Sequence, residues 1–351
     1  MLEQMSEASS SNAFIGRADM VPEVHRNDRR GAILGKCDEE PVFQAKCLDR
    51  YTHYRKLTEM DRQSNPVPDA PSTPGPAVLT TIASALGAAL LLLGILVGLV
   101  WIFQERIAFQ PPTPPQMIPA ASDDVRLDSY LAADGQRLIG FVVGSSPAAK
   151  GLLICFHGNA DLAGNAIEWA RRVSRSTGFT VMLAEYRGYM NLGGRPTYLT
   201  SQIDSEAAFT HARDSLHFTD ERIALYGHSL GTAVATELAT RHTPLSLVLE
   251  SPFTSAHDMA RIVAWRGIEI FWDLITRFHF DTLTAVSSID APVWVAHGTR
   301  DRVIPPAMGK QVFAAAKVKG QLLIVPDAAH NDVADVGGVE YWRWIEASLS
   351  R

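Results

Sequence analysis

The chain has 351 residues, enough for one sizeable domain with appended segments. Its formal net charge is −6 and it carries no cluster of basic residues, so nucleic acid is not expected as a partner. With 3 cysteines, the composition predicts no disulfide scaffold, and nothing in the sequence implies a metal or an organic cofactor.

Residues 1–76 are predicted to form a disordered tail. They combine mixed charge, few aromatic residues and little periodicity, and residues 65–76 are rich in proline, as is typical of stiff linkers. Cys37 and Cys47 are spaced too loosely for a metal-binding knuckle, and no histidine pair accompanies them. No function and no protein partner is assigned to this tail.

An uncharged apolar stretch at 77–103 is predicted to be a single transmembrane helix. About 20 apolar residues cross a bilayer, and this run is longer. Trp101 and Phe103 lie near one end, where aromatic residues often mark the membrane interface. The alternative is a buried helix of a soluble domain, but such helices seldom run this far without a polar face.

The charges that flank this stretch favour one orientation. Arg55, Lys56 and Arg62 precede it and Arg106 follows it, which favours a cytoplasmic N-terminus with the remainder of the chain on the far side. A signal peptide is not expected because 76 residues come first, whereas translation from near Met60 would make the stretch an uncleaved signal anchor.

A proline-rich linker at 104–124 leads into the predicted main domain, 125–351, in which strand-like runs alternate with helix-like ones. The predicted strands are 138–143, 152–156, 180–184, 223–226, 245–249, 293–296 and 322–325, and the predicted helices include 163–175 and 200–214. This alternation predicts an α/β fold with a mostly parallel sheet covered by helices on both faces. Cys155 falls within one of these strands, so a buried thiol is expected.

The pentapeptide 227–231, Gly-His-Ser-Leu-Gly, stands between a predicted strand and a helix-like run. In such an elbow the serine sits on a strained turn that exposes its hydroxyl. Gly227 and Gly231 are required because side chains at these positions would collide with the neighbouring strand and helix. Ser229 is therefore the candidate nucleophile, and the alternative is a glycine-rich turn without activity.

Two later loops contain an acid and a base for Ser229. Asp301 and His330 each lie just past the end of a predicted strand. In this interpretation Ser229 attacks a carbonyl, His330 takes its proton, and Asp301 holds the imidazole in the required tautomer. Glu250 also ends a strand and is the rival acid, but Asp301 is favoured because its strand directly precedes that of His330. His228 is expected to pack beside the serine without acting as its base.

The segment 253–290 is predicted to be a small lid. It is rich in apolar and aromatic residues at helical spacing, a pattern that more often indicates core than a substrate site. If part of the segment faces the cleft beside Ser229, it favours an acyl chain or another apolar group.

Residues from about 125 to 349 resemble small serine hydrolases of the α/β-hydrolase superfamily. The matching landmarks are 157–160, 185–189, 227–231, 250–253, 297–301 and 329–332. The set is similar to a membrane-anchored branch that includes depalmitoylating and lipid-hydrolysing members. One departure follows Tyr189, where such proteins usually continue Gly-x-Ser-x-Gly-x-Pro and this chain has Met-Asn-Leu-Gly-Gly-Arg-Pro at 190–196.

The resemblance implies an oxyanion hole made of two backbone N–H groups. One comes from Leu230, the residue after the nucleophile, and the other from the loop after an early strand, where Asn159 is the candidate and Ala160 the neighbouring option. The chain is therefore predicted to be a membrane-anchored hydrolase of an ester or thioester, acting on a small-molecule or lipid-like acyl substrate. The alternatives are a peptidase of the same fold and an inactive scaffold.

Overall fold

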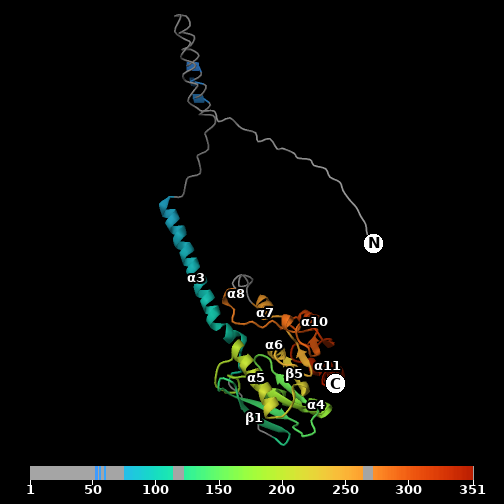
Figure 1. The fold of residues 1–351 in the computed structure, drawn as a ribbon. Helices are drawn as coiled ribbons and strands as arrows, with labels where there is room; N and C mark the ends of the chain where they lie inside the picture. The colour runs from blue at the N-terminus through green and yellow to red at the C-terminus, as the bar shows by residue number, and fades with distance from the viewer. Residues whose placement is uncertain are drawn as a thin grey trace, which may run out of the picture. The chain divides into compact units, whose positions relative to one another are not determined.

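The computed structural model describes residues 52–53, 55–56, 59–60, 75–113, 122–263 and 272–350 (Figure 1). Two compact units divide the chain, Met1–Ala83 and Ser84–Arg351, and the second contains the sheet and every candidate site residue. Most of the predicted tail, including Cys37 and Cys47, lies outside the described residues, as do 114–121 of the predicted linker and 264–271 of the predicted lid.

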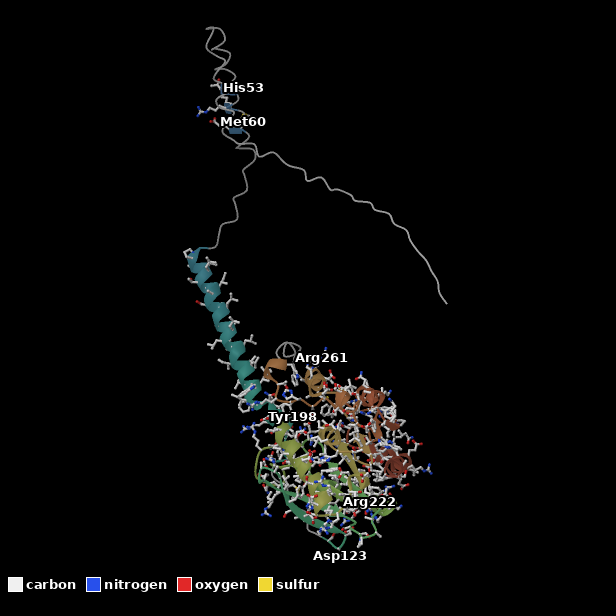
Figure 2. The ribbon with its side chains drawn as sticks, viewed as in Figure 1. His53, Met60, Asp123, Tyr198, Arg222 and Arg261 are labelled. Atoms are coloured by element: carbon white, nitrogen blue, oxygen red, sulfur yellow. The ribbon has the colours of Figure 1, made fainter. Side chains whose placement is uncertain are left out.

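Helix α3 (Pro76–Ala108) is long and apolar enough to cross a membrane, judged by length and composition alone. Its side chains are exposed along most of its length, and Figure 2 shows them standing out from the helix. The helix continues past the apolar stretch 77–103 into the segment predicted as linker. Burial increases in these last turns, where Glu105 is only 9% exposed.

An eight-stranded sheet forms the centre of the second unit, in the order β1-β2-β4-β3-β5-β6-β7-β8. Its strands are β1 (Val125–Leu131), β2 (Arg137–Val143), β3 (Leu152–Phe156), β4 (Thr180–Ala184), β5 (Ile223–His228), β6 (Leu247–Glu250), β7 (Val293–Gly298) and β8 (Lys319–Val325). Strand β2 pairs antiparallel with β1 on one side and with β4 on the other, and all other pairings are parallel. The predicted fold class is therefore confirmed.

Helices cover both faces of the sheet. One layer contains α4 (Ile167–Thr177) and α11 (Val333–Ser348), which pack against each other and against strands of the sheet. The other contains α5 (Tyr198–Asp214), α6 (Leu230–Ala239), α9 (Thr282–Ala285) and α10 (Pro306–Ala315). Short elements complete the order: η1 (Ala163–Ala166), η2 (Asp220–Arg222), α7 (Ala256–Val263) and α8 (Trp272–Ile275).

The core strands follow the hydrophobic pattern of the sequence closely. All residues of β3 and β4 are buried, because parallel strands covered on both faces are apolar throughout. The thiol of Cys155 is buried among them as expected, and burial raises its pKa well above the ordinary value. The carboxyl ends of β3, β5, β6, β7 and β8 meet at one edge of the sheet, where ligand sites form in open α/β folds.

Candidate active site

Ser229 occupies the sharp turn between β5 and α6. Its backbone has φ 52° and ψ −117°, a left-handed conformation that is strained for any residue with a side chain. The surrounding sheet holds the turn in place, since the Ser229 N–H donates to the carbonyl of Glu250 at 3.0 Å. This is the conformation expected of an elbow that pushes a serine hydroxyl clear of the backbone.

Close backbone packing explains the two glycines of the elbow. A Cβ atom on Gly227 would lie 2.3 Å from the carbonyl oxygen of Gly231, and one on Gly231 would lie 2.1 Å from that of Phe156. Both contacts are far below van der Waals distance and both are to backbone atoms. The turn therefore brings α6 against β5 and β3 more closely than any side chain would permit.

The structure brings Ser229, His330 and Asp301 into one hydrogen-bonded chain. The Ser229 hydroxyl donates to Nε2 of His330 at 2.9 Å, and Nδ1 of His330 donates to Oδ2 of Asp301 at 2.7 Å. Asp301 and His330 are buried at 7% and 8% exposure, so water competes little for these bonds. The carboxylate fixes the proton on Nδ1 and leaves Nε2 free to accept a proton from the serine.

A second histidine, His297, supports the acid. Its Nε2 lies 3.2 Å from Oδ2 of Asp301 and 3.0 Å from the Ile304 carbonyl oxygen. Burial disfavours the charged form of Asp301, but hydrogen bonds from His297, from His330 and from the Ile304 N–H outweigh it and hold the pKa of Asp301 well below its usual range. In the sequence, His297 was only the first residue of the landmark 297–301. Its i, i+4 spacing to Asp301 was the available signal.

Glu250, the rival acid, is directed elsewhere. Its Oε2 accepts hydrogen bonds from the hydroxyl groups of Tyr226 at 2.9 Å and Tyr341 at 2.6 Å. Burial, reinforced by the charge of Glu250, raises the pKa of both tyrosines well above the ordinary value. Nε2 of His228 donates to the His330 carbonyl at 3.1 Å, and the centroids of the two imidazole rings lie 5.1 Å apart.

The loop after β3 carries the candidate oxyanion donor. The side-chain oxygen of Asn159 accepts hydrogen bonds from the Gln110 N–H at 2.7 Å, the Ala160 N–H at 3.0 Å and the Tyr189 hydroxyl at 3.2 Å. These bonds fix the loop beside Ser229. Leu230 is the first residue of α6, where backbone N–H groups have no partner within the helix and the helix dipole favours negative charge.

A buried ion pair lies beneath the same loop. Both ring nitrogens of His157 face oxygens, Nε2 at 2.7 Å from Glu185 and Nδ1 at 2.8 Å from the Gly158 carbonyl, so both carry protons. Burial alone would lower the pKa of His157, but the adjacent carboxylate outweighs it and raises the pKa. Glu185 also accepts from the Ala163 N–H, which ties the loop to the next turn.

Two cavities meet at Ser229. An apolar one of about 400 Å³ is lined by Leu230, Met259, Trp272 and Ile275 among others. The other, of about 730 Å³, has a more polar lining (the polar cavity) and extends past His228 and His330. Met259, Trp272 and Ile275 of the predicted lid line the apolar cavity, and Met259 also packs against the core, so the segment contributes to both. Among the described residues, no group of three or more His, Cys, Asp or Glu is arranged to hold a metal ion.

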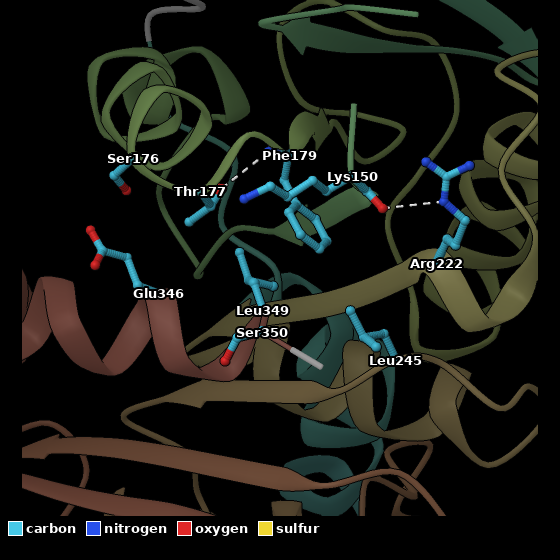
Figure 3. A pocket seen from close by; sticks show the side chains of 9 residues that line it. All are labelled: Lys150, Ser176, Thr177, Phe179, Arg222, Leu245, Glu346, Leu349 and Ser350. Carbon is cyan, nitrogen blue, oxygen red and sulfur yellow. Dashed lines mark hydrogen bonds between the residues drawn. The ribbon is translucent and has the colours of Figure 1, made fainter. Parts of the chain in front are cut away.

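A third cavity, of about 400 Å³, shares no lining residue with these two (Figure 3). It includes Lys150, Phe179 and Arg222, which precede β3, β4 and β5, so it lies at the amino ends of these strands. Arg222, labelled in Figure 2, donates from Nε to the Lys150 carbonyl at 3.2 Å. The Arg222 side chain is therefore occupied in a hydrogen bond to the backbone. The edge of the sheet formed by the carboxyl ends of the strands is the better candidate for catalysis.

Comparison with known proteins finds a family profile and several relatives that are similar to this chain. A family profile described as serine aminopeptidase, S33, matches residues 147–272. An uncharacterized protein of Mycobacterium tuberculosis is 32% identical over 246 residues, which cover 66% of this chain and 82% of the relative. The α/β-hydrolase domain-containing protein 17B of Homo sapiens is 31% identical over 202 residues, which cover 57% of this chain and 67% of that protein.

Among solved structures, an esterase of Pyrococcus furiosus superposes with a TM-score of 0.53 at 18% identity. The match covers 69% of this chain and 98% of the esterase, so the esterase corresponds to the sheet-containing part of this chain. At this identity, the likeness shows the fold alone.

Proposed function

This chain belongs to the α/β-hydrolase superfamily, and on that premise we propose that it cleaves a carboxylic ester or thioester through an acyl-enzyme formed on Ser229. The observation that carries the proposal is the hydrogen-bonded chain from the Ser229 hydroxyl through His330 to Asp301, with bonds of 2.9 and 2.7 Å. A serine hydroxyl is a weak nucleophile until a positioned base removes its proton during attack.

The reaction proceeds in two halves. Ser229 Oγ forms a bond to the substrate carbonyl carbon while Nε2 of His330 takes the hydroxyl proton. The resulting oxyanion is stabilised by the backbone N–H groups of Leu230 and Asn159, each worth roughly 3 kcal/mol if correctly aimed. Collapse of this intermediate breaks the bond to the alcohol or thiol, which receives the proton from His330. Water then attacks the acyl carbon while His330 takes its proton. Release of the carboxylic acid product returns a proton from His330 to Ser229 Oγ and regenerates the hydroxyl.

The substrate groups are assigned to the two cavities by their chemistry. The apolar cavity suits an acyl group, and the polar cavity suits the alcohol or thiol that leaves. Helix α3 is proposed to anchor the enzyme in a membrane, which would hold the site near lipids or acylated proteins. We further propose a cytoplasmic N-terminus with the catalytic domain on the other side, which protease protection in sealed vesicles would test.

Labelling by a fluorophosphonate probe tests the proposal directly, because only an activated serine reacts. We expect the full-length protein in detergent to be labelled at Ser229, as located by peptide mapping, and to hydrolyse p-nitrophenyl esters. The Ser229→Ala variant is the matched control and should show neither property. An unlabelled but folded wild-type protein would instead support an inactive scaffold.

A peptidase is the second candidate, favoured by the description of the matching family profile and by the charge of the polar cavity. Its lining includes the carboxylates Asp161, Glu250 and Asp335, and no lysine or arginine among the described residues. A free substrate amine would be attracted there. Amino-acid p-nitroanilides tested beside the esters decide between the two activities, since a peptidase would turn over the anilides with the higher kcat/KM.

A further inference from the structure

We propose that the last turns of helix α3 are a wall of the acyl-binding cavity and set its selectivity for long acyl chains. This inference rests on the proposed function and extends it to the substrate class. Four residues of α3 line the apolar cavity together with Ser229: Val100, Gln104, Ile107 and Ala108. Their spacing of i, i+4, i+7 and i+8 places them on one face of the helix.

The end of α3 is fixed to the lid by hydrogen bonds. The amide of Gln104 donates from Nε2 to the Ile275 carbonyl at 2.8 Å and accepts at Oε1 from the Arg277 N–H at 2.7 Å. These two bonds satisfy a backbone carbonyl at the end of α8 and an N–H of the segment that follows it, so α3 and the lid hold each other in place. Replacing Gln104 with an apolar residue would leave both half-buried backbone groups without this partner.

Charge and ring contacts strengthen the same junction. Glu105 is 9% exposed, and its carboxylate lies 3.7 Å from the Arg277 guanidinium and 3.8 Å from that of Arg195. The Arg277 guanidinium also stacks over the Trp101 ring, 3.7 Å from its centroid. Phe109, at 3% exposure, packs with its ring centroid 5.9 Å from that of Phe278. The junction therefore combines a buried carboxylate and a buried aromatic pair with a more exposed cation–π contact.

The chain leaving α3 then reaches the oxyanion loop. The Gln110 N–H donates to the Asn159 side chain at 2.7 Å, so the segment that forms the cavity wall also supports the residue proposed to bind the oxyanion. Met259 and Trp272 of the lid line the same cavity as α3. A chain held here contacts carbon on both sides, whereas an acetyl group would occupy only the part beside Ser229. Long chains should therefore depend on α3, and short ones should not.

Two substitutions that narrow the cavity from the α3 side test this inference. Ile107→Trp and Ala108→Leu are made in the full-length protein in detergent, and kcat/KM is measured for p-nitrophenyl acetate, octanoate and palmitate. We expect each variant to lose about tenfold or more in the palmitate-to-acetate ratio of kcat/KM, since one methylene of misfit in an apolar pocket costs that much.

Ile102→Trp is the matched control, because residue 102 lies on the opposite face of α3 and does not line the cavity. It should leave the whole chain-length profile unchanged. If both test variants still hydrolyse acetate and their palmitate-to-acetate ratio of kcat/KM equals that of the wild type, α3 is not a wall of the acyl site. If the wild type neither hydrolyses acetate nor reacts with the fluorophosphonate, the proposed function itself fails.

Discussion

Asp301→Asn is expected to lower kcat for ester hydrolysis by about 10⁴-fold with little change in KM, the size of loss that this replacement causes in other Ser-His-Asp triads. The structural reason is the 2.7 Å bond from Nδ1 of His330 to the Asp301 carboxylate. An asparagine can turn its NH₂ group towards Nδ1, which forces the imidazole proton to Nε2. His330 would then face the Ser229 hydroxyl with a donor instead of an acceptor.

Glu250→Gln is the matched control for that variant. Glu250 is also a buried carboxylate at the end of a strand, at 6% exposure, but its partners are the hydroxyl groups of Tyr226 and Tyr341. A glutamine oxygen can still accept from them, so we expect activity within a few-fold of wild type and a stability loss of about 1–3 kcal/mol. Steady-state kinetics and thermal melting measure both. The opposite pattern of activity loss would reassign the acid to Glu250.

The depressed pKa of Asp301 predicts how its contribution to stability varies with pH. In the unfolded chain the group titrates near 3.8, and in the folded chain it stays charged to a lower pH. Its stabilising contribution is therefore fully present above the unfolded pKa and is lost as pH falls through the folded pKa. The difference in unfolding free energy between wild type and Asp301→Asn should be constant from about pH 5 to 8 and should shrink below about pH 4. A difference that grows on acidification would contradict the assignment.

The sequence predicted elements best where burial is complete. The strands at 152–156 and 180–184 agree with β3 and β4 at both ends, because fully buried parallel strands are uninterrupted apolar runs. Strand β1 was missed, since its residues are largely exposed and it lies at the edge of the sheet. Its side chains carry little hydrophobic pattern, and its position is fixed by pairing with β2.

Long-range contacts account for the features of the site that the sequence did not predict. The linker was expected to begin at 104 because Gln104 and Glu105 end the apolar run, yet both are helical and contact residues about 170 positions away. A polar residue at the end of an apolar stretch is predicted to be exposed unless its partner in the fold is known. The link from His297 to Asp301 is local in sequence, but only the loop geometry shows that the ring turns towards the carboxylate.

Gly231→Ala is expected to destabilise the protein by at least about 3 kcal/mol and to abolish most activity. A Cβ atom at this position would lie 2.1 Å from the Phe156 carbonyl oxygen, 2.6 Å from its carbon and 2.8 Å from the His157 carbonyl oxygen. All three belong to the backbone of β3 and the oxyanion loop, at the centre of the sheet. Helix α6 cannot keep its position, and Ser229 lies in the turn directly before its first residue.

Gly193→Ala is the matched control for this steric effect. A Cβ atom there would meet only the side chain of Gln136, at 3.7 Å, which is ordinary contact. Melting temperature and fluorophosphonate labelling of both variants measure the two consequences. A shift of about 1 Å in a reacting group can cost 10²-fold in rate, so any folded Gly231→Ala protein should label far more slowly than Gly193→Ala. Equal melting and labelling of the two variants would show that α6 does not pack on β3 as closely as the structure places it.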